Sequence, residues 1–167
     1  MATTTNNVAE KRLIAWLKDA HAMERSLETA LTKQADHAKS DPAMRMRLEQ
    51  HAQETRRHAE MVESALHRHG ADTSTLKTAM GKMQAGFQGM MSGAAGDTKI
   101  KDTLTGIAAE HFEIACYKSL ETAATELGDE QTASMCREIL RDELSMAAFL
   151  EEQLPRVTRV ELVEAAS

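Results

Sequence analysis

The chain has 167 residues, of which 28% are charged, and a formal net charge of −6 at pH 7. This length corresponds to one domain that can bury an adequate hydrophobic core. Aromatic residues make up only 3%, helix-forming residues dominate, and alternating β-branched and aromatic runs are lacking. The composition therefore predicts an all-α fold and excludes an all-β one. The acidic balance argues against a nucleic-acid-binding protein.

Helix-breaking residues divide the chain into four long predicted helices. Asp41 and Pro42 mark the start of the second helix, and Gly70 and Gly128 the ends of the second and third. The helices are expected at about 8–39, 42–69, 98–127 and 129–154, with a short helix at about 75–91. Residues 1–155 would form the bundle, and residues 156–167, after Pro155, a C-terminal tail.

The lengths of the connections predict how the helices are arranged. Tight turns make the first and second helices antiparallel, and likewise the third and fourth. The long connection between the second and third helices can cross the whole bundle, which is typical of a ferritin-like four-helix bundle with one crossover. No apolar run is long enough to span a membrane, and the first ten residues lack the apolar core of a signal peptide. We therefore expect a cytoplasmic protein without membrane contact.

Each predicted helix has a glutamate on the side that should be apolar. The four residues are Glu24, Glu54, Glu113 and Glu143, and Glu110 lies one turn before Glu113. Glu24 and Glu54 are equally far from the first turn, and Glu113 and Glu143 are equally far from the second. All four carboxylates are therefore expected at one level of the bundle.

Clustered buried carboxylates need a compensating charge, because burying each one costs several kcal/mol. No lysine or arginine lies on the apolar sides at that level, and two divalent cations would balance the four glutamates. His51 is the expected nitrogen ligand, since neutral imidazole adds a ligand without adding charge. Further ligands, or residues around the metal, are His21, His58, Tyr117 and Glu138. The alternatives are a metal-free polar core and an incorrect assignment of the apolar sides.

Several segments resemble the YciE/YciF-like family of ferritin-like stress proteins. They are HAMERSLETAL, RLEQHAQETRRHAEMVESAL, AAEHFEIACYKSLETAATELG and REILRDELSMAAFL, and the match extends over about residues 9–154. EHFEIACY at 110–117 and the H-x-x-E-T of 51–55 are the most specific parts. The resemblance implies a four-helix bundle with a di-iron-type carboxylate site and bacterial, stress-linked expression.

The ligand motif departs from that of ferritins and rubrerythrins, which place Glu-x-x-His on two helices. Here the order is reversed, as His21-x-x-Glu24 and His51-x-x-Glu54, and the last helix offers Glu143 without a histidine. One metal position is therefore expected to be poor in nitrogen ligands.

A dinuclear centre of this composition predicts oxidation of Fe(II) by O₂ or peroxide, with iron as the expected metal and manganese as an alternative. Glu24 and Glu143 would be terminal ligands, and Glu54 and Glu113 would bridge, or exchange that role with Glu110. The alternative functions are a stress-induced structural module in which metal only stabilises the bundle, and an oxygenase acting on an organic substrate. A homodimer is expected from an apolar stripe in the connector, formed by Leu76, Met80, Met83, Phe87 and Met90.

Overall fold

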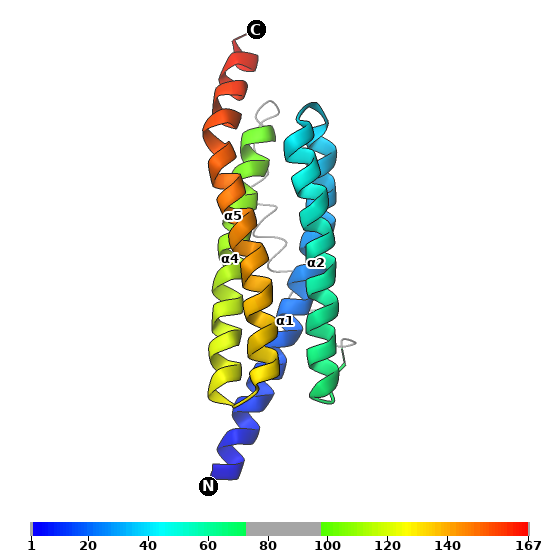
Figure 1. Ribbon diagram of the computed structural model, residues 1–167, viewed down its shortest axis with the longest axis vertical. Helices are drawn as coiled ribbons and strands as arrows, with labels where there is room; N and C mark the ends of the chain where they lie inside the picture. The colour runs from blue at the N-terminus through cyan, green and yellow to red at the C-terminus, as the bar shows by residue number, and fades with distance from the viewer. Residues whose placement is uncertain (1, 73–97, 167) are drawn as a thin grey trace.

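Four long helices form an all-α bundle in the computed structural model, which describes residues 2–72 and 98–166 (Figure 1). They are α1 (Ala2–His37), α2 (Pro42–Arg68), α4 (Thr98–Glu126) and α5 (Glu130–Ala165), and a 3₁₀ turn, η1 (Ala38–Ser40), joins α1 to α2. The predicted all-α class and the four-helix bundle are confirmed. The short helix expected at about 75–91 lies outside the described residues.

The helix directions agree with a bundle that has one crossover. In Figure 1, α1 and α2 form one antiparallel pair, and α4 and α5 form another. The chain leaves α2 at one end of the bundle and enters α4 at the other end. Gly70 and Gly128, expected as helix ends, follow α2 and α4 with left-handed φ angles of 66° and 74°.

The predicted end of the last helix at Leu154 is wrong, because α5 continues through Pro155 to Ala165. Contacts with the rest of the bundle hold the turn that follows the proline. Val157 is buried, and Arg156 forms an ion pair with Asp41 at the start of α2. The tail expected at 156–167 is therefore helical as far as Ala165. The first helix also differs from its prediction, because it begins at Ala2 and not at about residue 8. Residues 2–7 contain no helix breaker, but they lack the apolar period that was used to place the start of the helix.

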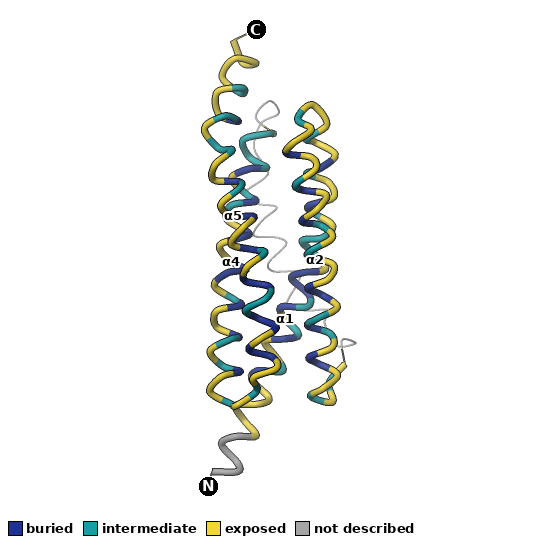
Figure 2. Tube along the Cα trace, in the orientation of Figure 1, coloured by how far each residue is buried: buried dark blue, intermediate teal, exposed yellow. Residues whose placement is uncertain are grey.

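Two hydrophobic clusters form the core, and the buried faces of the helices turn toward the bundle interior (Figure 2). One cluster includes Leu17, Val62 and Ile139, and the other includes Leu48 and Leu150. The intervening stretches of the helices hold buried polar side chains, including three of the four glutamates predicted to lie at one level, whereas the fourth, Glu54, is only partly buried. Apolar layers therefore separate this polar level from both ends of the bundle.

Replacing Asp129, the N-cap of α5, should lower stability in a pH-dependent way. Its side chain accepts a hydrogen bond from the Thr132 backbone (3.0 Å) and another from His69 Nε2 (2.9 Å). Burial raises the pKa of Asp129, but the hydrogen bonds from Thr132 and His69 outweigh burial and leave the pKa below its ordinary value. The stabilisation is therefore complete above the unfolded-state pKa and is lost as pH falls through the lower folded-state pKa. We expect Asp129→Ala to cost about 1 kcal/mol at pH 7.

Urea unfolding of Asp129→Ala and wild type between pH 7 and pH 2 measures this effect. The difference between the two proteins should shrink at the acidic end. Asp36→Ala, at an exposed position near the end of α1, is the control and should cost less. A difference that does not depend on pH would contradict the assigned role of the Asp129 carboxylate.

Candidate metal centre

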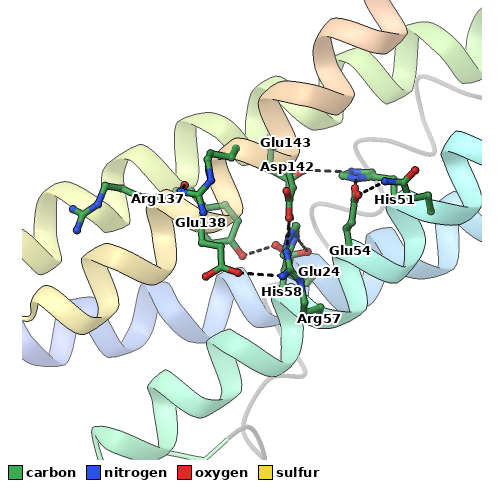
Figure 3. Close-up of polar contacts among 12 residues, drawn as sticks. Glu24, His51, Glu54, Arg57, His58, Arg137, Glu138, Asp142 and Glu143 are labelled. Atoms are coloured by element: carbon green, nitrogen blue, oxygen red, sulfur yellow. Dashed lines mark hydrogen bonds and ion pairs between the residues drawn. The ribbon is translucent and has the colours of Figure 1, made fainter.

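Carboxylate and imidazole side chains from all four helices meet inside the bundle. The residues are Glu24 from α1, His51 and His58 from α2, Glu110 and Glu113 from α4, and Glu143 from α5, and all six are buried. His51 and His58 are two helical turns apart, so they lie on the same face of α2. Figure 3 shows both histidines close to Glu143.

Two groups of three side chains have the spacing that a metal ion requires. One group is Glu24, His58 and Glu143, and the other is His51, Glu110 and Glu143. Within each group, one ligand atom from every residue lies within 4.8 Å of the others. Each group combines one imidazole nitrogen with two carboxylates, a donor set that suits iron, manganese or zinc.

Glu143 belongs to both groups, and its two oxygens face different histidines. Oε1 lies 2.9 Å from His58 Nδ1, and Oε2 lies 3.3 Å from His51 Nε2. The second carboxylate of each group is also close, since Glu110 Oε2 lies 3.3 Å from His51 Nε2 and Glu24 Oε2 lies 3.8 Å from His58 Nδ1. One carboxylate placed between two groups has the position of a bridging ligand.

The potential ligand atoms are buried and form no well-aligned hydrogen bond, although Glu143 and the two histidines lie at ion-pair distance. They are Glu24 Oε2, His51 Nε2, His58 Nδ1, Glu110 Oε2, Glu113 Oε1 and both oxygens of Glu143. Buried polar atoms without a partner are costly and need a physical explanation. Metal ions would supply the missing interactions, so the residues present fit a metal centre.

Three carboxylates of the centre resist ionisation when no metal is present, whereas, against the effect of burial, the two histidines lower the pKa of Glu143 to about 2. Burial, together with the charge of Glu143, raises the pKa of Glu24 to about 8. Burial raises the pKa of Glu110 to about 7, although His51 opposes this rise. Burial and the neighbouring carboxylates raise the pKa of Glu113 well above its ordinary value. Divalent cations would favour the ionised forms of all these groups.

Each histidine is held by a hydrogen bond from its other ring nitrogen. His51 Nδ1 donates to Glu54 (2.8 Å), and His58 Nε2 donates to Asp142 (3.0 Å). Arg57 donates in turn to Asp142 (2.6 Å). These bonds leave His51 Nε2 and His58 Nδ1 facing the centre, as metal-bound histidines require.

The structure distributes the remaining predicted residues around this centre. Glu113 is buried beside it but belongs to neither group, and the Tyr117 hydroxyl donates a hydrogen bond to Glu24. His21 is partly buried, and its Nδ1 lacks a partner. Glu54 lies outside both groups and binds His51, while Glu138 is partly buried and pairs with Arg57.

Asp142 is a residue of this centre that the sequence pattern did not indicate. It precedes Glu143, so it lies toward the edge of the inward face of α5, where carboxylates are ordinarily solvated. His58 was the available signal for such a residue in the sequence. It lies two turns after His51 on the same face of the helix, so as a metal ligand it would also need a carboxylate to fix its other ring nitrogen.

Removing either outer carboxylate should weaken metal binding without abolishing it. Glu54→Gln would release His51, and Asp142→Asn would release His58, so the ring orientations would no longer be fixed. Loss of such partners typically costs about 10- to 100-fold in metal affinity. Competition titrations with a chelator would measure this loss. Glu49→Gln, at an exposed position on α2, is the matched control, and Glu54→Gln binding as tightly as that control would contradict the role of Glu54.

Comparisons with known proteins agree with this architecture. Residues 8–163 match the family described as "Domain of unknown function (DUF892)". A protein structure from Xanthomonas campestris pv. campestris is 30% identical, with a TM-score of 0.80, over 95% of this chain and 99% of that one. The Escherichia coli stress protein YciF is 23% identical, with a TM-score of 0.73, over 90% of this chain and 97% of that one. YcfI from Rhodopseudomonas palustris is 22% identical, with a TM-score of 0.72, over 86% of this chain and 92% of that one.

Proposed function

Since the chain belongs to the DUF892 family of YciF-like proteins, we propose that it is a dinuclear metal protein that oxidises Fe(II) with O₂ or peroxide. The family resemblance predicted from the sequence is confirmed by that membership. The proposal rests mainly on one observation: two buried ligand groups share Glu143. Iron is the proposed metal, and manganese would suit the same oxygen-rich donor set.

In this proposal each metal has one histidine and one carboxylate of its own. His58 and Glu24 would hold one ion, His51 and Glu110 the other, and Glu143 would bind both. Glu113 would provide a further carboxylate beside the pair. The bridging role expected for Glu54 thus passes to Glu143, and Glu54 becomes a partner of His51.

The proposed reaction transfers one electron from each of two Fe(II) ions. With O₂ the two electrons and two protons give hydrogen peroxide, and with peroxide they give two water molecules. Bound iron supplies the one-electron redox chemistry of this reaction. The buried carboxylates favour the higher positive charge of the oxidised ions. The hydroxyl of Tyr117 fixes one oxygen of Glu24, which leaves the other oxygen directed to His58.

Oxygen-electrode measurements test the proposed reaction. Wild type should consume O₂ or peroxide when Fe(II) is added, and the consumption should saturate after a few equivalents per chain. Glu24→Ala should lower the rate at least about tenfold, because one metal loses its own carboxylate. Glu49→Gln is the control and should match wild type.

Other outcomes of this experiment would favour the alternative functions. Metal bound without any consumption of O₂ or peroxide would favour a structural module. Consumption that depends on an added organic compound, with that compound oxidised, would favour an oxygenase. A Glu24→Ala variant as fast as wild type would contradict the proposed redox centre.

The proposal also includes the physiological setting expected from the sequence. We infer stress-linked expression in the bacterial cytoplasm and assembly as a homodimer. The apolar stripe on which the dimer was predicted lies outside the described residues. Among the helices of residues 2–72 and 98–166, none is long and apolar enough to cross a membrane.

A further inference from the structure

A cavity of about 510 Å³ lies between α1 and α4. Trp16 and Met23 line it from α1, and Phe112, Cys116 and Leu120 line it from α4. Met23 and Phe112 directly precede two carboxylates of the centre in the sequence. The volume lies in the range typical of sites for small organic molecules.

The cavity is open to solvent and has aromatic walls. Trp16 is 43% exposed and Phe112 is 45% exposed, so a ligand could cover apolar surface on both rings. Small side chains, Ala20, Ala22 and Ala115, leave the space between the helices open. Covering this surface with an apolar ligand would be favourable by roughly 25 cal/mol per Å².

The charge around the cavity selects the kind of ligand. Asp19 is the single charged side chain among the described residues that line it. The cavity therefore combines two aromatic side chains with one carboxylate, which favours a cation over a neutral molecule or an anion.

We propose that this cavity binds a small organic cation in which an ammonium group is attached to an apolar body. The apolar body would lie against Trp16 and Phe112, and the ammonium group would lie near Asp19. This binding does not depend on the proposed iron oxidation, since none of the three residues belongs to the metal-binding groups.

Trp16 is the only tryptophan in the chain, so its fluorescence reports on the cavity directly. We would titrate the full chain with three probes of similar shape: phenethylamine, phenethyl alcohol and phenylpropionate. The expected result is saturable binding of the amine, at least about threefold tighter than the alcohol, with the carboxylate weakest. Equal affinities for all three, or no saturable change with the amine, would overturn the proposal.

Two pairs of variants locate the binding site. Asp19→Asn should weaken amine binding about threefold and leave the alcohol unchanged, while the control Asp36→Asn should change neither. Ala115→Phe should fill the cavity from an exposed position and abolish binding, while the control Ala108→Phe, also exposed on α4, should not. Circular dichroism would show that each variant is folded, and metal analysis would show that the centre is unchanged. Amine binding that survives Ala115→Phe would place the ligand elsewhere and overturn the proposal.

Discussion

The Glu143→Gln variant is expected to lose both metal ions. One oxygen of Glu143 faces His58 and the other faces His51, so both groups depend on this single side chain. Glutamine keeps the size of glutamate but replaces one oxygen with a hydrogen-bond donor and removes the negative charge. Elemental analysis after gel filtration should therefore find about two metals per chain in wild type and close to none in the variant.

Single-group variants serve as the comparison for Glu143→Gln. Glu24→Gln should affect the metal held by His58, and Glu110→Gln the metal held by His51, so each should retain about one ion per chain. Glu152→Gln, at an exposed position on α5, is the matched control and should retain both. A Glu143→Gln protein with the same metal content as Glu152→Gln would contradict the sharing of Glu143.

Removal of the metals should lower the melting temperature of wild type by about 5–10 °C for each site that is strongly occupied. A ligand at 100 times its dissociation constant stabilises the folded state by about 2.7 kcal/mol, and 1 kcal/mol corresponds to roughly 2–4 °C in a chain of this size. The physical cause is the set of buried carboxylate and imidazole atoms that make no well-aligned hydrogen bond without metal. Thermal unfolding followed by circular dichroism, before and after treatment with a chelator, measures the shift.

Glu143→Gln provides the control for this experiment as well. Chelator should change its melting temperature little, because it holds little metal. Equal melting temperatures for metal-loaded and metal-free wild type would show that metal does not bind preferentially to the folded bundle.

Much of the fold follows from the sequence because its helices are long, periodic and bounded by clear signals. Asp41 with Pro42 and the two glycines after α2 and α4 mark boundaries by local chemistry, which a single sequence reveals. The continuation of α5 through Pro155 depends instead on contacts with residues far along the chain, such as the ion pair of Arg156 with Asp41. Local sequence preferences do not account for such contacts, so a prediction based on them ends the helix too early.

The composition of the candidate site was predictable to the level of helix faces, and no further. Helical period identifies Glu24, Glu113 and Glu143 as inward residues at one level, and all three are buried. It does not determine which atoms meet, because that depends on side-chain rotamers and on the separation of the helices. Glu54 illustrates this limit: it lies one turn from His51 on the same helix, and its carboxylate reaches the outer nitrogen of that histidine.

The most direct test of the central claim is the number of metal ions that bind tightly to wild type. Metal-free protein would be titrated with Fe(II) without oxygen, and in parallel with Mn(II), with binding followed by calorimetry and elemental analysis. Two buried groups that share Glu143 predict two ions per chain for wild type and loss of both in Glu143→Gln. One ion or none in wild type, or two ions that persist in Glu143→Gln, would contradict a dinuclear centre built on this carboxylate.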